Sequence, residues 1–449
     1  MPGRWSSVCS AGSTSSAFFC TVIAFLVWTD AKRISGVPCY QLALSPKRLK
    51  PSLSTGLTAR FSSYIVRCII QCNINTQQTR RDITMQHEQS GVRATLSRDA
   101  SALNLVEFWK EREDIEIREP RKTAVPHLWQ WSEINPRLAS ASKTVPIEEC
   151  ERRALVFANP GLGGKPYITS TLFAAYSLYN PGESAPVHRH TPCASRFVLQ
   201  GNGGFTTVAG EKIPMSRGDL VLTPHGCWHD HGNDGTEPVV WVDVLDVPLI
   251  EALNSTRFEF DYAEEGQTKT TQSISRPSGY STRLYSYGGI TPTFVDHQRG
   301  SVDHSPMFVY RWQDTREALK AMADLPGSPY DAITVEYTNP VSGGSVMPTM
   351  SHRSTLLRAG EKALSQRSTA SSVFVVLEGS GTTEINGVRF DWKPNDVFCV
   401  PAWVWYHHEA VGGEAVLYSV TDSPSLTKLG LMRKQGRTND GAIVELEAA

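Results

Sequence analysis

Apolar and polar residues alternate in short runs along most of this chain, and glycine, proline or asparagine closes many of the runs. A period of two is typical of β-strands that bury one face, and the closing residues favour tight turns. The runs lie at 171–179, 196–199, 204–208, 220–223, 239–245, 373–378, 382–385, 397–400 and 415–420. A helical period is clearer at 103–115 and 314–323. The pattern predicts an all-β protein with a few peripheral helices.

A repeated motif divides the chain into two related halves. The repeated positions are Asn159-Pro160-x-x-Gly163-Gly164 with Gly182 and Gly201, and then Asn339-Pro340-x-x-Gly343-Gly344 with Gly360 and Gly379. In both halves the last two glycines are nineteen residues apart. We therefore expect two copies of one barrel, at 85–266 and 281–449, joined by a Ser/Thr-rich linker at 267–280.

Histidines are concentrated in the first copy, where five of the twelve fall between residues 188 and 231. Side chains two positions apart on a strand share a face and are about 7 Å apart, so His188 and His190 can reach one ion. A third imidazole from a nearby strand would complete a metal site. A lone histidine is more often a packed or surface residue, and His225 stays in that class.

The residues around these histidines form two motifs. The first is Gly182, five residues, His188-x-His190 and Gly201; the second is Gly218, five residues, Pro224-x-Gly226, two residues, His229, three residues, Asn233. The pair resembles the motifs of the cupin superfamily, whose small antiparallel barrels hold a metal between two strands. The resemblance implies a bicupin, with two double-stranded β-helix (jelly-roll) barrels.

One departure from the usual cupin pattern concerns charge. Many metal-binding cupins have a glutamate four or five residues after the second histidine, where this chain has Ala194 and Ser195, followed by Arg196. Three neutral imidazoles leave a divalent metal its full charge, and a guanidinium makes the pocket more positive. Such a pocket should prefer a substrate that brings a carboxylate and an adjacent hydroxyl.

From about residue 103 to 429 the chain resembles gentisate 1,2-dioxygenases. The segments that carry the resemblance are 125–129, 151–155, 159–166, 182–201, 218–233 and 240–246. The resemblance implies cleavage of the aromatic ring of gentisate by O2 to maleylpyruvate, with iron(II) (Fe²⁺) as the cofactor. It also implies a homotetramer.

The resemblance implies roles for particular residues. His188, His190 and His229 would bind iron. Arg196 would anchor the substrate carboxylate, and His231, with Asp243 as a possible orienting partner, would exchange a proton with the substrate hydroxyls. These three are the predicted catalytic residues, and Arg152 or Arg153 would add a second cation.

Several alternatives stay open from the residues alone. Arg196 and Asp243 could simply pair to hold the barrel shut, and His231 could be an outward turn residue. Relatives often carry Trp and Gln where this chain has Phe173 and Ser177. A sister activity on salicylate or 1-hydroxy-2-naphthoate is therefore the rival enzyme. A metal-free bicupin that binds or stores small molecules is the rival of another class.

The second barrel is predicted to lack metal ligands. Gln366-Arg367-Ser368 stands where the first copy has His-x-His, and Tyr406 stands where it has His229. His407 and His408 remain nearby, but two imidazoles from one segment make a weak site. We expect this barrel to give structural support or oligomer contacts.

Composition and charge are compatible with a folded enzyme. The chain has 449 residues, of which 40% are hydrophobic and 20% charged, enough for two sizeable cores. Residues 1–81 carry ten Lys or Arg and one acid, which gives them a charge of +9. Because the net charge of the whole chain is −1, the remaining residues carry −10. A body of that sign suggests no nucleic-acid partner.

The N-terminal 84 residues are the hardest to interpret. The apolar run at 17–29 is too short to predict a membrane span, so no stable membrane partner is expected, although a signal segment or mitochondrial presequence stays open. A third possibility is that translation naturally starts at Met85. Only four of the nine cysteines follow this segment, which favours a reducing compartment and a cytoplasmic location.

Overall fold

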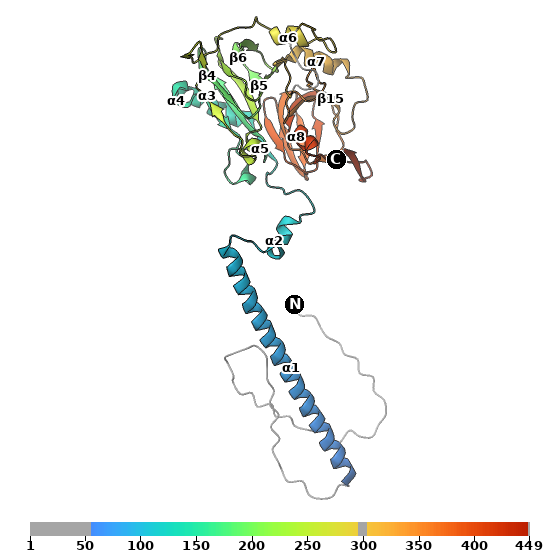
Figure 1. Cartoon of the computed structure of the whole chain (residues 1–449). Helices are drawn as coiled ribbons and strands as arrows, with labels where there is room; N and C mark the ends of the chain where they lie inside the picture. The colour runs from blue at the N-terminus through green and yellow to red at the C-terminus, as the bar shows by residue number, and fades with distance from the viewer. Residues whose placement is uncertain (1–54, 295–302, 448–449) are drawn as a thin grey trace. The chain divides into compact units, whose positions relative to one another are not determined.

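The computed structural model describes residues 55–294 and 303–447. The chain divides into two units, with the boundary between residues 112 and 113 (Figure 1). The predictions for the apolar run at 17–29 lie outside the described residues. Within the described part, no helix is both long enough and apolar enough to cross a membrane.

The N-terminal unit contains one long helix, α1 (Thr55–Ala102), and α2 (Phe108–Ile115) begins shortly after it. Met85, the alternative start, lies inside α1. From residue 81 onward nearly every side chain of α1 is exposed, so no buried apolar face stabilises this part of the helix.

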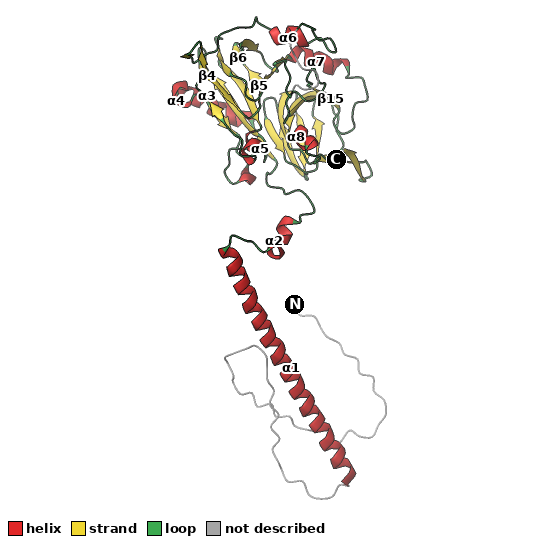
Figure 2. Cartoon of the chain, viewed as in Figure 1, coloured by secondary structure: helices red, strands yellow, loops and turns green. Residues whose placement is uncertain are grey.

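Two antiparallel barrels make up the second unit, which confirms the predicted fold class (Figure 2). One sheet of the first barrel has the order β14 (Val309–Tyr310), β8 (Leu220–Thr223), β5 (Ala194–Gln200), β10 (Val239–Leu245), β3 (Phe173–Tyr179) and β2 (Ala154–Val156). Its other sheet has the order β11 (Phe258–Glu259), β4 (Ser184–His190), β9 (His229–Asn233), β6 (Gly204–Val208) and β7 (Glu211–Met215).

The second barrel repeats this arrangement. One sheet has the order β1 (His127–Trp129), β21 (Val397–Val400), β18 (Ser372–Glu378), β23 (Ala415–Thr421), β16 (Ser351–Leu357) and β15 (Ile333–Glu336). The other has β20 (Val388–Trp392), β19 (Gly381–Ile385), β22 (Tyr406–Ala410), β17 (Gln366–Ser368), β24 (Lys434–Arg437) and β25 (Ile443–Glu447). Short helices lie around the barrels: α3 (Trp131–Thr144), α4 (Ile147–Cys150), α5 (Val247–Ala252), α6 (Tyr280–Tyr285), α7 (Trp312–Ala321) and α8 (Ser423–Lys428).

The repeated glycines have a steric cause. Gly201 has φ +87°, and a Cβ there would lie 2.4 Å from the carbonyl oxygen of Pro238. Its counterpart Gly379 has φ +72°, and a Cβ would lie 2.2 Å from the carbonyl oxygen of Glu414. Each position needs both the left-handed conformation and the absence of a side chain, so glycine recurs in both barrels.

The barrels exchange edge strands. β1, which precedes the first barrel in the chain, pairs with β21 of the second barrel. β14, which follows the first barrel, pairs with β8 of that barrel. The sheets therefore cross the predicted boundaries 85–266 and 281–449 in both directions, and one apolar core spans the two barrels. In this core the rings of Phe197 and Tyr418 stack with centroids 3.8 Å apart.

The segment 267–280, predicted as a linker, packs along the first barrel. Its first residues form β13 (Gln267–Thr268), which pairs with β12 (Ala263–Glu264). The backbone N–H of Val187 donates to the carbonyl of Thr270 over 2.9 Å, and that of Gln272 donates to Asp230 over 3.0 Å. These bonds fix the segment beside the histidine strands.

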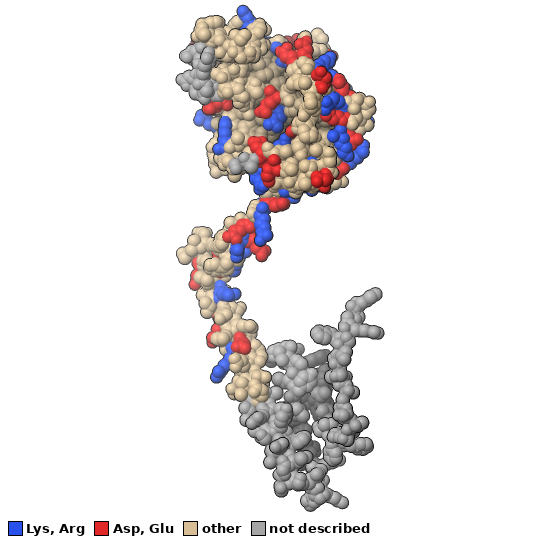
Figure 3. Space-filling view, turned by 90° about the vertical axis from the view of Figure 1, so that its right-hand side faces the viewer, with Lys and Arg blue, Asp and Glu red and all other residues tan. Residues whose placement is uncertain are grey.

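Charged side chains of both signs are interspersed over the face of the barrels in Figure 3. Arg389, for example, lies 2.7 Å from Asp391, and both side chains are exposed. Exposed pairs of this kind add little stability, about 0–1 kcal/mol each.

His352, on β16, predicts an acid-sensitive step in stability. The residue is 0% exposed, and neither ring nitrogen has a hydrogen-bond partner among the described residues. Burial lowers the pKa of His352 to about 3, so the folded protein keeps this ring neutral. Below about pH 6.5 the unfolded chain takes up a proton on this histidine, and the free energy of unfolding therefore falls. We expect His352→Phe to reduce the stability lost between pH 8 and pH 5 by about 2 kcal/mol. Urea unfolding of both proteins at the two pH values measures this difference, and equal losses would refute it.

Candidate metal centre and substrate pocket

Four histidines from two neighbouring strands lie close together inside the first barrel. β4 carries His188 and His190, and β9 carries His229 and His231, with His188 and His229 paired in register. The ring centroids of His188 and His229 are 4.3 Å apart, and those of His190 and His229 are 4.8 Å apart. All four residues are at most 3% exposed, so His231 is not an outward turn residue.

Hydrogen bonds set the proton positions on three of these rings. The Nδ1 atoms of His188, His190 and His229 lie 2.8, 2.6 and 2.9 Å from backbone carbonyl oxygens of Pro186, Pro192 and Cys227. A carbonyl can only accept, so each Nδ1 carries the ring hydrogen and each Nε2 keeps a lone pair. The Nε2 of His229 is buried and has no hydrogen-bond partner. This is the arrangement of imidazoles that ligate a metal through Nε2.

His231 differs from the other three in its hydrogen bonding. Its Nδ1 lies 3.3 Å from Nη2 of Arg196, and a guanidinium can only donate. Nδ1 is therefore an acceptor, and the neutral ring carries its hydrogen on Nε2.

The distances between the rings and the positions of their hydrogens point to two different sets of three metal ligands. Possible ligand atoms of His188, His229 and His231 lie within 4.8 Å of one another, and this is the only such group among the described residues. The proton positions favour the predicted set, His188, His190 and His229, because those three rings present lone pairs. His231 lies just as close, but its Nε2 carries a hydrogen and therefore offers no lone pair to a metal.

The site keeps its histidines neutral. Burial, followed by the nearby Arg152, lowers the pKa of His188 to about 3, and burial lowers the pKa of His190 to about 4. Burial also holds the pKa values of His229 and His231 well below the usual range. Neutral nitrogen donors with available lone pairs fit a divalent transition metal, and no proton has to be removed at pH 7 before it binds.

Arg196 connects His231 with Asp243. The arginine lies on β5, is 3% exposed, and contacts Asp243 Oδ1 through Nε at 3.1 Å. Its Nη1 also donates to Thr223 over 2.9 Å. Neither Nε nor Oδ1 has a well-directed hydrogen bond, so the contact is an ion pair without the geometry of a strong hydrogen bond. Asp243 is thus linked to His231 through Arg196.

Asp243 is held from its other side as well. Its Oδ2 accepts hydrogen bonds from Ser177 over 2.6 Å and from the indole of Trp241 over 2.9 Å. The ring of Trp241 stacks on Tyr179, which in turn meets His231 edge to face with centroids 5.4 Å apart. The carboxylate is therefore fixed on both oxygens, and it fixes the direction of the Arg196 side chain.

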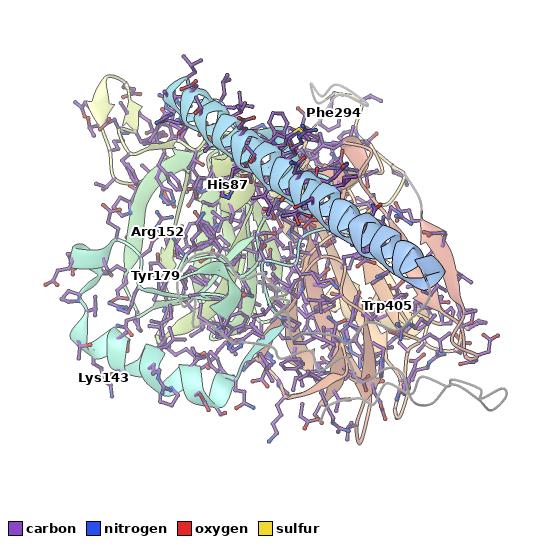
Figure 4. The ribbon with its side chains drawn as sticks, turned by 90° about the horizontal axis from the view of Figure 1, so that it is seen from below. His87, Lys143, Arg152, Tyr179, Phe294 and Trp405 are labelled. Atoms are coloured by element: carbon purple, nitrogen blue, oxygen red, sulfur yellow. The ribbon has the colours of Figure 1, made fainter. Side chains whose placement is uncertain are left out.

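The structure distinguishes the two candidate arginines. Arg153 is 4% exposed and binds Glu183 through both terminal nitrogens, at 2.7 and 2.8 Å, which raises the arginine pKa. Arg152 lines the pocket, and its Nη1 lies 3.5 Å from Nε2 of His188. Arg152 therefore faces the site, on the first-barrel side seen in Figure 4 together with Tyr179.

A pocket of about 460 Å³ adjoins His190. Its polar wall includes Arg152, Arg196, Asp243 and Ser177. Its apolar wall is built from short side chains and two rings: Ala154, Val156, Ala175, Leu245, Phe173 and Phe258. One wall thus suits a carboxylate, and the other suits a flat apolar ring.

Sequence reasoning missed three residues of this region. Phe258 comes from the two-residue strand β11, and its ring lies 5.1 Å from that of His190. Tyr179 and Trp241 lie in strands that were predicted, but alternation alone does not show which aromatic ring supports a histidine. His225 remains outside the group, with its Nδ1 3.8 Å from the thiol of Cys193.

Comparison with known proteins places the chain in a family. A model described as a cupin domain matches residues 175–245 and 355–421. The chain is 38% identical to gentisate 1,2-dioxygenase 1 of Aquipseudomonas alcaligenes, over 74% of this chain and 92% of that protein. It is 36% identical to 5-aminosalicylate 1,2-dioxygenase of a Comamonas species, over 77% of this chain and 91% of that protein.

A solved structure agrees with these relatives. The crystal structure of salicylate 1,2-dioxygenase from Pseudoaminobacter salicylatoxidans with gentisate matches with a TM-score of 0.71 and 34% identity, over 77% of this chain and 94% of that chain. Long matches at this identity, together with two cupin domains in one chain, fix the relationship. The chain therefore belongs to the family of gentisate and salicylate 1,2-dioxygenases, ring-cleaving enzymes of the cupin superfamily.

Proposed function

We propose that this protein is an iron(II)-dependent gentisate 1,2-dioxygenase. It cleaves gentisate between the carboxyl-bearing carbon and the neighbouring hydroxyl-bearing carbon, and both atoms of O2 enter the product, maleylpyruvate. The observation that carries the proposal is a cap of neutral imidazoles beside two arginines, with Arg152 3.5 Å from His188 and Arg196 3.3 Å from His231. Such a site favours an anionic ligand that completes the metal coordination.

His188, His190 and His229 would hold the iron. Bound there, iron(II) supplies open positions for a chelating hydroxy acid and for O2, and carries electrons between them. Because the three imidazoles are neutral, the aromatic acid would be the anionic ligand of the metal. Binding of the acid and O2 at one metal would bring the two reactants together.

The chain's own residues would orient the acid and handle its protons. Arg196 and Arg152 would bind the carboxylate, and the apolar wall with Phe173 and Phe258 would hold the ring and exclude water. His231, neutral and carrying its hydrogen on Nε2, would donate a hydrogen bond to a substrate oxygen, or return a proton to it. Arg196 and Asp243 would keep that imidazole in the required tautomer.

A sister activity is the second candidate, because the wall that meets the ring is mostly apolar. Ser177 gives its hydroxyl hydrogen to Asp243, so it is not available to donate to the second hydroxyl of gentisate. Phe173 lines the same pocket, and a volume of about 460 Å³ accommodates one or two rings. Salicylate and 1-hydroxy-2-naphthoate are therefore the substrates to compare with gentisate.

Parallel assays test this assignment. The protein is reconstituted with iron(II) without oxygen, and ring cleavage and O2 uptake are then followed with gentisate, salicylate and 1-hydroxy-2-naphthoate. We expect about one iron per chain, one O2 per ring cleaved, and the highest kcat/KM with gentisate. A higher value for either other acid would make the sister activity the function, and a chain that retains no iron would favour the metal-free binding protein.

A further inference from the structure

The second barrel contains a cavity at the position that the substrate pocket occupies in the first barrel. The register pairs that frame the two spaces correspond. They are His188–His229 and His190–Phe258 in the first barrel, and Gln366–Tyr406 and Ser368–Lys434 in the second. The metal-ligand positions have thus become Gln366, Ser368 and Tyr406, while a space beside them has been kept.

The retained cavity is smaller and more polar than the substrate pocket. Its volume is about 180 Å³, compared with about 460 Å³ in the first barrel. Three apolar wall positions have gained hydroxyl groups: Ala194, Leu245 and Val247 correspond to Ser372, Thr421 and Ser423. Phe374, Tyr406 and Met432 still line the cavity, but the three exchanged positions of the apolar wall now carry hydroxyl groups. A barrel that only gave support would favour a filled apolar interior, because polar groups are costly to bury without partners.

A neutral histidine, His408, lies in the wall of this cavity. The indole of Trp392, which can only donate, donates to the hydroxyl of Thr383 over 2.9 Å. The same hydroxyl lies 2.8 Å from Nδ1 of His408 and joins the two side chains by hydrogen bonds. His408 is 5% exposed, and burial lowers its pKa to about 3, so the ring is neutral at pH 7. Its ring lines the cavity.

Two cations, Lys434 and Arg353, line the cavity together with two carboxylates, Asp331 and Glu447. Lys434 lies 2.7 Å from Asp331, and Arg353 lies 3.2 Å from Glu336. Each cation has more N–H groups than these ion pairs use, so donors remain for a ligand. Gln366 donates to Asp331 over 2.8 Å, and its Oε1 is a buried acceptor with no hydrogen-bond partner among the described residues.

We propose that this cavity is a metal-free binding site for a small aliphatic hydroxycarboxylate. The carboxylate accepts hydrogen bonds from Lys434 and Arg353. The ligand's hydroxyl group exchanges hydrogen bonds with the Ser and Thr side chains of the wall. The small volume and the more polar wall select against aromatic acids, so the two barrels of one chain bind different acids.

Calorimetry with L-malate tests the proposal on the full-length, iron-loaded protein without oxygen. We expect one L-malate per chain, and at least about tenfold weaker binding in Lys434→Gln, which loses a charge-assisted hydrogen bond. Thr421→Val removes one hydroxyl at nearly constant volume and should weaken binding severalfold. The melting temperature of Lys434→Gln shows whether that variant folds. If it does not fold, Thr421→Val alone carries the test. Gentisate turnover should be unchanged in both variants.

Arg196→Ala is the matched control, because it alters the first pocket only and should bind L-malate normally. Succinate, which lacks the hydroxyl, should bind more weakly than L-malate, and salicylate should not displace L-malate. The proposal is overturned if L-malate does not bind, if salicylate displaces it, or if Arg196→Ala loses binding while Lys434→Gln and Thr421→Val retain it. Binding of L-malate and turnover of gentisate are separate readouts, so failure of one proposal leaves the other intact.

Discussion

Replacing His229 with alanine is expected to abolish both iron binding and ring cleavage. Its Nε2 is a fully buried lone pair without a partner, and its Nδ1 is fixed by the carbonyl of Cys227 at 2.9 Å. Two imidazoles cannot replace the three-ligand cap, so iron after anaerobic reconstitution should fall from about one per chain to below about 0.1, and turnover by at least about a thousandfold. Metal analysis and O2 uptake measure the two effects.

His225→Ala is the matched control for His229→Ala. This histidine is exposed and lies four residues away, so its variant should keep iron and activity. His190→Ala and His231→Ala then separate the two possible ligand sets. Hydrogen bonding predicts that His190→Ala loses iron, whereas His231→Ala keeps iron and loses turnover. The reverse outcome would assign the ligands by proximity, as His188, His229 and His231.

Arg196→Ala is expected to keep iron and to lower kcat/KM for gentisate by about a hundredfold or more. The guanidinium is 3% exposed, and removal of one buried charged partner of a substrate carboxylate costs on the order of 3 kcal/mol. The loss should fall mainly on substrate use, because Arg196 hydrogen-bonds His231 and none of the three predicted ligands. Steady-state kinetics together with iron content measure it.

The same variant tests whether Arg196 merely closes the barrel. Arg196→Ala leaves Asp243 without its cation, so some stability is lost as well. Arg196→Met/Asp243→Asn removes both charges and should restore stability but not turnover. Arg189→Ala is the control, since this arginine pairs with Glu259 at 2.6 Å and is 37% exposed. Unchanged turnover in Arg196→Ala would show that its anchoring role is wrong.

Much of the fold could be predicted because alternation and turn residues are local signals. The runs 204–208, 220–223, 239–245 and 397–400 are strands with those limits. The repeated glycines, among them Gly201 and Gly379, predicted two barrels. They recur because each of these two positions requires a left-handed backbone and has no room for a Cβ. These requirements are visible without knowledge of any distant contact.

The elements that were missed depend on tertiary contacts or on conflicting local signals. The helix predicted at 103–115 was wrong at its start, because α1 ends at Ala102, Asn104 has φ 56°, and α2 begins at Phe108. α3 was not predicted, since Pro136 lies inside it and its apolar pattern is weak. The exchange of β1 and β14 could not be foreseen, because strands of two or three residues carry no period.

The site shows the same limit. Strand alternation predicted that His188 and His190 share a face, but the choice between Arg152 and Arg153 needed the position of Glu183. Likewise, the second barrel was expected to give support or oligomer contacts. Whether small polar side chains leave a cavity depends on packing, which no local pattern records.

The central claim is that a metal capped only by imidazoles, beside Arg196 and Arg152, takes its anionic ligand from the substrate. A crystal structure of the anaerobic iron(II) protein with gentisate tests this claim most directly. We predict that the carboxylate and the adjacent phenol oxygen of gentisate both coordinate iron, that His188, His190 and His229 are its only protein ligands, and that Arg196 contacts the carboxylate. Gentisate lying away from the iron, or an Asp or Glu oxygen in the coordination sphere, would contradict it.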